Sequence, residues 1–352
     1  MSNTPLKVAL VGHGYFAPFH ARAWQRLDGA DLTSVVGVDL AKAGEFAAQH
    51  NITSVHDSVI SLAANEPPDI VDIVTPPETH ARLIRECVVS GVPWVICQKP
   101  FCRDLAEAEE LLADIANRGT TVVVHENFRF QPWYQEIAAL LDTGVLGTIY
   151  EVRFNLRPGD GQGPDAYLER QAYFREQPQL LIRETGVHFI DLFRHLMGEV
   201  DGVFARLSRL NPVITGEDAG LVMFEFSNGA RGLLNANRLV DHKADNTRRV
   251  MGEMTIEGSD ATLTLDGAGQ IRVRAHGDQD AITHEYTFDD TDFGGDCVHR
   301  CCQHILSHIT DGSALANRAE DYLVNRRIEA LVYASNSEQR WLGIREPAHR
   351  YT

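Results

Sequence analysis

The sequence predicts an α/β protein with two parts: a doubly wound domain on a parallel sheet, then an α/β domain on a large, mostly antiparallel sheet. From Lys7 to Asn127, short β-branched runs alternate with helix-length amphipathic segments, which is the pattern of repeated βαβ units. From Asp201 to Phe288, runs of period two are separated by turn signals such as S-N-G and D-G-A-G, which are typical of antiparallel strands. A chain of 352 residues is long enough for two ordinary domains. We place them at residues 1–127 and 128–352.

Strand runs and helix ends mark the elements of the first domain. Its expected strands are K-V-A-L-V, D-L-T-S-V-V-G-V, D-I-V-D-I-V, P-W-V-I-C and T-T-V-V-V-H. Helices are expected at 79–90 and 104–118, and each is followed by a glycine, Gly91 or Gly119, where a helix end favours a left-handed residue. Because strands alternate with helices, neighbouring strands should pair in parallel.

The second domain has several helices and one long connection. We expect helices at 131–141, 180–197, 296–311 and 318–340, and a strand at 149–156. The last helix could instead pack back on the first domain. Residues 157–179 form a loop rich in Gly, Pro and Gln that is longer than the usual connection of about 4 to 6 residues. A lid over the substrate is a reasonable hypothesis for this loop.

The composition excludes several classes of protein. With 32 Lys and Arg against 49 Asp and Glu, the formal charge of -17 repels nucleic acid and anionic membranes. No apolar run approaches the roughly 20 residues of a membrane-spanning helix. The N-terminal sequence shows no secretory signal, and the six cysteines are sparse for this length, which indicates reduced thiols. We therefore expect a cytoplasmic protein that binds a small molecule.

A glycine-rich turn directly follows the first strand. Gly12, Gly14 and Ala17 have the G-x-G-x-x-G/A spacing, with Tyr15 and Phe16 between them, and a helix-length segment comes next. Small residues are needed there because the backbone must turn tightly and approach a pyrophosphate, whose charge the helix N-terminus meets. In this strand-turn-helix context, the motif predicts a Rossmann domain in which all five residues lie near a bound dinucleotide.

Asp39 follows the second strand and bears on the choice of dinucleotide. A carboxylate at this position can accept hydrogen bonds from both hydroxyls of the adenosine ribose, and it would repel the extra phosphate of NADP. The sequence therefore favours NAD over NADP. Alternatively, Asp39 only caps the helix that begins near Ala41, and Lys42 leaves some tolerance of NADP open.

Polar residues also follow the later strands of the first domain. Thr75, Pro76 and His80 come after D-I-V-D-I-V, and Gln98 and Lys99 come after P-W-V-I-C. The carboxyl ends of parallel strands open on one edge of a doubly wound sheet, and dinucleotide and substrate bind at that edge. We therefore expect these five residues to line the cofactor site.

Four motifs are spread along the chain: T-P-P-E-T-H (75–80), Q-K-P-F (98–101), E-N-F-R-F-Q-P (126–132) and T-G-V-H-F-I-D (185–191). They resemble those of the glucose-fructose oxidoreductase and inositol dehydrogenase family, also called Gfo/Idh/MocA, and the resemblance spans essentially the whole chain. It implies an N-terminal Rossmann domain and a C-terminal α/β domain with a large, mostly antiparallel sheet. It also implies NAD-dependent hydride transfer at a CH-OH group and a homodimer or homotetramer formed through that sheet.

The resemblance further assigns chemical roles. Lys99 matches the lysine of the family's E-K-P turn, which reaches both the nicotinamide and the reacting hydroxyl. His188 matches the histidine of the family's D-x-G-x-H motif. The chain departs from the pattern at two positions, because Gln98 stands where the turn usually has Glu and Glu184 stands where the motif usually has Asp. The longer Glu184 side chain leaves its role open.

Helical spacing independently groups the residues around His188. Glu184, His188 and Asp191 fall at i, i+4 and i+7 and would share one helical face, so that a carboxylate can orient the imidazole. With an ordinary pKa near ~6.5, His188 is the better base at neutral pH, and Lys99, with an ordinary pKa near ~10.4, would polarise the oxygen. The two roles could be shared or reversed. The alternative for His188 is a buried histidine beside capping or salt-bridged acids.

Further polar residues are candidates for the binding site. Asn127 and Arg129 follow the last expected strand of the first domain, T-T-V-V-V-H, where the family lines the nicotinamide pocket. Trp133 could pack near the cofactor or anchor a helix equally well. In the second domain the candidates are Arg157, Tyr167, Arg183 and Asn237. They could bind sugar hydroxyls or a carboxylate, although exposed surface is the default for such residues.

Cysteines and histidines near the C-terminus raise the question of a metal. Cys297, Cys301, His304 and His308 lie at helical spacings, with His299 and Cys302 nearby. Four ligands along one straight helix cannot surround a tetrahedral ion, so at most two adjacent ones could contribute. We expect no metal and interpret the cysteines as part of a helix core.

The leading hypothesis is an NAD-dependent dehydrogenase of a sugar, first an aldose oxidised at C1, with a pentose such as D-apiose as one candidate. Arg183 would instead suit a sugar acid, and a polyol is a third option. An enzyme of a different class would retain NAD through an isomerase, lyase or glycosidase cycle and release no net NADH. A non-enzymatic NAD-binding regulator is disfavoured because Lys99 and His188 are both present.

Overall fold

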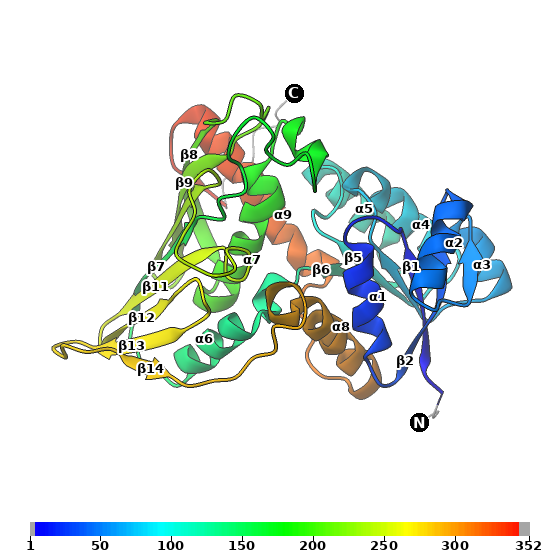
Figure 1. Ribbon diagram of the computed structural model, residues 1–352, viewed down its shortest axis with the longest axis horizontal. Coiled ribbons are helices and arrows are strands. Elements are labelled where there is room, and N and C mark those ends of the chain that lie inside the picture. The colour runs from blue at the N-terminus through cyan, green and yellow to red at the C-terminus, as the bar shows by residue number, and fades with distance from the viewer. Residues whose placement is uncertain (1–3, 345–352) are drawn as a thin grey trace. The chain divides into compact units, whose positions relative to one another are not determined.

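The structure is a computed structural model that describes residues 4–344 (Figure 1). The chain forms two compact units. The first contains the described residues up to Phe130 together with Asp296–Arg326, and the second contains Gln131–Gly295 together with the described residues from Arg327 onward. A single division of the chain near residue 127 does not separate the two units, because the later segment Asp296–Arg326 packs within the first unit.

The first unit is built on a parallel sheet that has six strands within residues 4–344, in the order β3-β2-β1-β4-β5-β6. The strands are β1 Leu6–Val11, β2 Ala30–Val36, β3 Ser54–His56, β4 Ile70–Ile73, β5 Trp94–Gln98 and β6 Thr121–His125. The strand order reverses between β1 and β4, which is the switch point where such a sheet opens a crevice for a ligand. The predicted doubly wound sheet is confirmed. Only the short β3 was not expected, because three residues are too few to show a period.

Helices connect these strands, and local capping sets several of their ends. The helices of this unit are α1 Ala17–Gln25, α2 Leu40–Gln49, α3 Val59–Asn65, α4 His80–Val89, α5 Leu105–Ile115, most of α8 Phe293–Asp311 and the first part of α9 Ala319–Glu338. Asp104 caps α5 by accepting from the Glu107 backbone N–H at 2.8 Å. After α4, Gly91 has a φ of 74°, the left-handed conformation that the sequence predicts at this helix end.

The second unit is built on a sheet with nine strands among the described residues, in the order β14-β13-β12-β11-β7-β10-β9-β8-β15. The strands are β7 Ile149–Leu156, β8 Val200–Ser208, β9 Ala219–Phe226, β10 Arg231–Asn237, β11 Gly252–Gly258, β12 Ala261–Leu265, β13 Ile271–Ala275, β14 Ile282–His284 and β15 Leu342–Gly343. Neighbouring strands are antiparallel except β7 and β10, which are parallel. The predicted large, mostly antiparallel sheet is confirmed.

Helices α6 (Pro132–Asp142) and α7 (Val187–Met197) lie along one face of this sheet (Figure 1). Phe189 and Phe193 of α7 pack against Phe154 of β7 and Phe224 of β9, with ring centroids 4.2 and 5.6 Å apart. The expected helix over 180–197 needs a correction: Ile182–Gly186 is π-helical, and the α-helix begins only at Val187. Short 3-10 turns occur at η1 Pro77–Thr79, η2 Phe128–Phe130 and η3 Ala172–Arg175.

Within residues 4–344, no helix combines the length and the apolar composition that crossing a bilayer requires.

Candidate functional site

The glycine turn after β1 is shaped for a closely approaching ligand. Gly12 has a φ of 109°, and a Cβ there would lie 2.6 Å from the Val74 carbonyl oxygen, so only glycine fits. A Cβ at Gly14 would meet no described atom within 4 Å, so the space beside it is open. Helix α1 begins at Ala17, and no described side chain caps its first turn. These features fit a pyrophosphate, which needs backbone access and free N–H groups at a helix N-terminus.

Asp39 lies at the carboxyl end of β2, where the sequence predicts it. Its carboxylate caps α2 by accepting from the Lys42 backbone N–H at 3.2 Å, and it pairs with Lys42 Nζ at 3.0 Å. The hydrogen bond from the Lys42 side chain holds the pKa of Asp39 below its ordinary value, so the group is a carboxylate at neutral pH. The capping role is thus present, and Asp39 also stays partly exposed at the edge where a ribose would bind.

The turn after β4 is held together by its own polar groups. The hydroxyls of Thr75 and Thr79 are 2.7 Å apart, and His80 Nε2 lies 2.8 Å from the Thr75 carbonyl oxygen. The His80 side chain is fully buried, and burial lowers its pKa to about 4, so it is neutral at pH 7. His80 therefore supports the Thr75–Pro76 turn from beneath, a different placement from the direct contact that the sequence suggests.

Gln98, the residue before Lys99, is tied into a buried polar network. Its amide Nε2 lies 2.7 Å from His20 Nε2 and 3.2 Å from His125 Nδ1, and His20 Nδ1 lies 2.7 Å from Asp72 Oδ2. All four side chains are more than nine-tenths buried. Gln98 thus anchors the end of β5 from below, which leaves the partly exposed Lys99 as the residue of this turn with a reactive group at the edge.

The residues that the structure brings close enough to share a metal ion differ from the set that the sequence suggests along the C-terminal helix. His20, His125 and Cys302 each place a ligand atom within 4.8 Å of the others, and Cys302 is the only one from α8. Gln98 Nε2 already donates a hydrogen bond to one nitrogen of each imidazole. His304 accepts from the Ala316 backbone N–H at 2.9 Å. All six cysteines of the sequence lie in the described part, buried and free of disulfides.

Asn127 and Arg129 lie just after β6, at the same sheet edge as Lys99. Asn127 is buried, and its carbonyl oxygen accepts from Phe130 N–H at 3.0 Å, which closes the short turn η2. Arg129 is partly exposed. Gly12, Asp39, Thr75, Lys99 and Asn127 thus follow five different strands of one parallel sheet, and all lie at its carboxyl edge. The sheet topology therefore places these five residues along one edge.

In the second unit, Glu184 and His188 lie on either side of the change from π- to α-helix. Both side chains are more than nine-tenths buried, and Asp191 is fully buried. The Val187 N–H donates to the Ile182 carbonyl, five residues earlier, which widens the turn that carries Glu184. Regular α-helical spacing therefore applies from Val187 onward, where His188 and Asp191 lie three residues apart, whereas Glu184 lies in the wider π-helical turn.

Side chains from distant segments define the start of the π-helical turn. Glu217 Oε1 accepts from the Ile182 backbone N–H at 3.1 Å and from the Tyr333 hydroxyl at 2.6 Å. The Tyr333 oxygen accepts in turn from the Arg183 backbone N–H at 3.2 Å. These partners satisfy N–H groups that a regular helix would leave open at its first turn. Such π-helical turns are frequent at functional sites.

The other predicted binding residues of the second unit are mostly occupied by structural contacts. Arg157 donates to the carbonyl oxygens of Leu156 and Asn235, and Arg183 lies 3.6 Å from the Glu329 carboxylate. Asn237 accepts from the Leu239 backbone N–H, and Tyr167 is buried. Trp133 of α6 is fully buried and packs against Phe288. It therefore anchors this helix. The charge of Arg183 is therefore already balanced within the protein.

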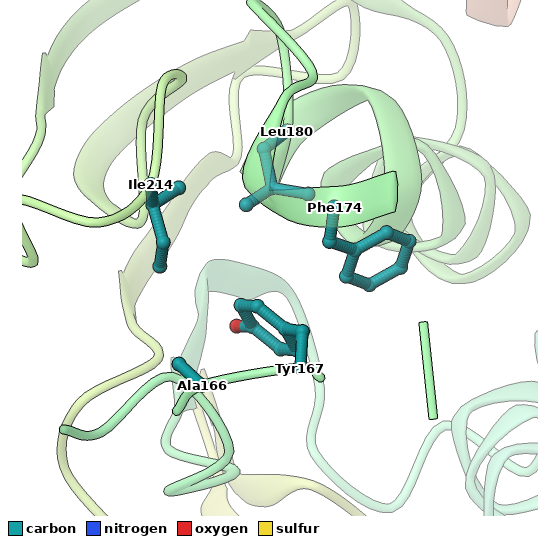
Figure 2. Packing of buried hydrophobic residues seen from close by; sticks show 5 residues of the cluster. All are labelled: Ala166, Tyr167, Phe174, Leu180 and Ile214. Carbon is teal, nitrogen blue, oxygen red and sulfur yellow. The ribbon is translucent and has the colours of Figure 1, made fainter. Parts of the chain in front are cut away.

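The loop 157–179 is packed against its own unit. Ala166, Tyr167 and Phe174 of the loop form a hydrophobic cluster with Leu180 and Ile214, which Figure 2 shows from close by. A buried arginine, which sequence analysis did not single out, lies beside this cluster. Arg238 binds the loop through Asp160 and the π-helical turn through Thr185, at 2.7 Å in each case. Its only sequence signal was its place within the stretch Asp201 to Phe288, where antiparallel strands are predicted.

Comparison with known proteins identifies both units. Residues 6–126 match a family model described as an oxidoreductase family with an NAD-binding Rossmann fold, and residues 134–263 match the GFO/IDH/MocA C-terminal domain. A D-apiose dehydrogenase from Rhizobium rhizogenes is 30% identical over 273 residues, which is 78% of this chain and 77% of the relative. The similarity therefore extends over most of both proteins.

Solved structures share the fold along nearly the whole chain. An oxidoreductase from Agrobacterium radiobacter, in complex with NAD+, L-tartaric acid and magnesium, has a TM-score of 0.85 and 26% identity, and the match covers 97% of this chain and 99% of that one. A levoglucosan dehydrogenase in complex with NADH and L-sorbose has a TM-score of 0.81 and 19% identity, covering 98% and 100%. The second likeness shows the fold alone.

These findings agree with the geometry of the glycine turn. They confirm the predicted fold, NAD as the cofactor, and the reaction class, oxidation at a CH-OH group. The chain belongs to the Gfo/Idh/MocA family of oxidoreductases, with an NAD-binding Rossmann domain at its N-terminus.

Proposed function

We propose that this protein is an NAD-dependent sugar dehydrogenase whose first candidate substrate is an aldose oxidised at C1, such as the pentose D-apiose. The observation that carries the proposal is the turn at Gly12 and Gly14, where steric room and an uncapped helix N-terminus suit NAD, at the same sheet edge as Lys99. The similarity to a D-apiose dehydrogenase supports the sugar.

NAD, when bound, accepts the hydride from the carbinol carbon. The first unit would hold it through the backbone of Gly12, Gly14 and Ala17 and through the Asp39 carboxylate. Tyr15 and Phe16, on the outer part of the same turn, would flank it. Carboxylate binding to the ribose hydroxyls requires Asp39 to keep its negative charge, which its lowered pKa ensures.

The chain's own residues would manage the proton. We propose that His188 takes the hydroxyl proton and that Lys99 donates a hydrogen bond to the same oxygen, which stabilises the charge that develops there. The reverse assignment uses the same two groups. Glu184 would orient the sugar or His188, and Asn127 and Arg129 would contact the nicotinamide or the sugar. The product is a lactone from an aldose, or a ketone from a secondary alcohol.

A sugar acid is the second candidate substrate. The similar oxidoreductase from Agrobacterium radiobacter was solved with L-tartaric acid, a hydroxy acid. Within this chain, however, the Glu329 carboxylate balances the charge of Arg183, and Arg157 already uses its Nη1 on two backbone carbonyl oxygens. These contacts favour a neutral sugar.

The deciding experiment measures NADH formation by the full-length protein across aldoses including D-apiose, polyols and aldonates. We expect the highest kcat/KM with a neutral aldose and NAD. A preference for aldonates would replace the first candidate by the second. Release of a converted sugar without net NADH would overturn the proposal in favour of an isomerase, lyase or glycosidase, and tight NAD binding without any turnover would favour a regulator.

We further propose that the protein is a cytoplasmic homodimer or homotetramer assembled through the nine-stranded sheet. On the face opposite α7, Leu221 and Met223 of β9 and Leu233 of β10 are only partly exposed and form an apolar patch, with Met223 and Leu233 directly paired. Buried cysteines that form no disulfides are consistent with a reducing compartment. Light scattering coupled to gel filtration tests the assembly: a monomer at micromolar concentration would contradict it.

A further inference from the structure

The side chain of Arg238 connects two segments of the second unit that surround Glu184. It follows β10 directly and is only 2% exposed, although it carries a charge. Nη2 and Nε donate to the two carboxylate oxygens of Asp160 at 2.7 and 3.1 Å, and Nε also lies 2.6 Å from the Tyr167 hydroxyl. Nη1 donates to Thr185 Oγ1 at 2.7 Å. One guanidinium group thus binds the loop 157–179 and the π-helical turn together.

The apolar surroundings hold the guanidinium in one orientation. Its carbon lies 5.3 Å from the ring centroid of Tyr167 and 5.5 Å from that of Phe174, both in the loop cluster of Figure 2. The Tyr167 hydroxyl also donates to Asp160 at 3.3 Å, and burial raises its pKa, so it keeps its proton. A planar, fork-shaped donor suits this set of partners, and a lysine could not replace it.

A second contact links the same two segments. Gln177 near the end of the loop donates from Nε2 to Glu184 Oε1 at 3.0 Å. The loop is therefore attached to the turn twice, once at the carboxylate of Glu184 and once at Thr185, the next residue. Thr185 itself lies three residues before His188. A shift of this turn would move both side chains that we assign to the reaction.

We infer that Arg238 is a positioning residue, which fixes the π-helical turn of Glu184 against the loop 157–179 and so sets the orientation of Glu184 and His188 toward the sugar. The inference rests on the proposed function. It also gives the loop a defined role: it is a fixed wall of the sugar site that Arg238 and its partners hold in place. Substrate specificity would then depend on loop residues, although Arg238 itself touches no substrate.

The test removes the hydrogen bond between Arg238 and Thr185 and leaves the ion pair between Arg238 and Asp160 intact. Thr185→Val keeps the side-chain shape but cannot accept from Arg238, whereas Thr185→Ser keeps the oxygen. For Thr185→Val we expect kcat/KM for the sugar to fall about ten- to a hundredfold, because a small misplacement of reacting groups costs about that much. The Kd of NAD should stay that of the wild type, since the glycine turn belongs to the first unit. Thr185→Ser should turn over like the wild type.

A matched variant separates positioning from general stability. Ser335 is fully buried in α9 of the same unit, where its hydroxyl binds the Ala205 N–H and the Arg340 carbonyl, and neither of these partners belongs to the π-helical turn. Ser335→Ala should lower the melting temperature but keep kcat/KM. The inference is overturned if Ser335→Ala lowers turnover as much as Thr185→Val, or if Thr185→Val turns over like the wild type.

Hydrogen exchange on the full chain gives a readout that does not depend on turnover. Thr185→Val should speed exchange in residues 182–186. Arg238→Lys, whose single ammonium cannot reach Asp160, Tyr167 and Thr185 together, should speed it in 157–179 as well. Faster exchange in a protein that oxidises no sugar would contradict the proposed function and support the coupling of the two segments. Unchanged exchange in both variants would contradict the inference even in an active dehydrogenase.

Discussion

The two units build their functional groups in different ways. In the first unit, the cofactor turn is made of backbone: Gly12 adopts a φ that only glycine tolerates easily, and Gly14 leaves open space beside the chain. In the second unit, the turn of Glu184 is made by side chains that arrive from elsewhere, namely Glu217, Tyr333 and Arg238. The first depends on local geometry and the second on long-range contacts.

This difference predicts which changes each unit tolerates. A turn made of backbone should lose NAD binding when a single Cβ is added. A turn held by side chains should instead lose its exact position gradually, as each partner is removed. It also predicts that NAD binding and sugar turnover can be damaged separately. Three measurements examine this contrast, in addition to the variants of Thr185 and Arg238.

The largest effect is expected from the two proposed reacting groups. Lys99→Met and His188→Asn should each lower kcat by about two to four decades, which is the usual contribution of a positioned acid or base. The double variant should have a kcat only slightly below that of the less active single variant, because the effects of two groups that serve one step are not additive. Steady-state NADH formation and titration of NAD measure both effects, and His188→Asn should keep the wild-type Kd of NAD.

Two surface residues of the same types serve as controls. Lys7 is exposed at the opposite, amino end of β1, and His195 is exposed on α7. Lys7→Met and His195→Gln should turn over like the wild type. Full additivity of Lys99→Met and His188→Asn would show that the two groups act in separate steps, which contradicts the shared role.

A pair of glycine variants tests the backbone-made turn. Gly12→Ala places a Cβ 2.6 Å from the Val74 carbonyl oxygen at a φ of 109°, so it should destabilise the fold by about 1–3 kcal/mol and abolish NAD binding. Gly14→Ala meets no described atom within 4 Å, so it should fold like the wild type but weaken NAD binding by filling the space of the pyrophosphate. Urea unfolding and calorimetric NAD titration distinguish the two. Wild-type NAD affinity in Gly14→Ala would rule out a pyrophosphate at this turn.

A pH dependence of stability is expected from the turn after β4. The pKa of His80 is lowered from 6.5 to about 4 by burial, so the unfolded chain takes up a proton at a pH where the folded protein does not. The contribution of His80 is therefore complete above about pH 6.5 and is lost as the pH falls toward about 4, by at most about 1.4 kcal/mol per pH unit.

Urea unfolding of the wild type and of His80→Gln at several pH values measures this contribution. The variant should lose part of the acid sensitivity and keep the part that comes from His125, whose pKa burial lowers to about 3. If His80→Gln destabilises equally at every pH, His80 acts by packing alone.

Much of the fold follows from local patterns. The strand before the loop 157–179 was expected at 149–156 and is found there, and Asp104 and Gly91 mark helix ends as their chemistry predicts. Several site residues do not behave as their spacing suggests, because His80 and Gln98 are buried beneath the turns that they were expected to line. Spacing places a residue at a strand end, but it does not tell whether the side chain points out of the sheet edge or back into the interior.

The sequence by itself determined the parallel sheet, the glycine turn and the family, because these depend on periodicity and on steric demands that neighbouring residues impose on one another. Tertiary structure alone decided that α8 belongs with the first unit, that Gln98 joins two imidazoles, and that Ile182–Gly186 winds as a π-helix. Each of these depends on partners far apart in the chain, such as Glu217 for Ile182 and Arg238 for Thr185. A hydrogen bond between distant residues leaves no period in the sequence, so only the folded chain reveals it.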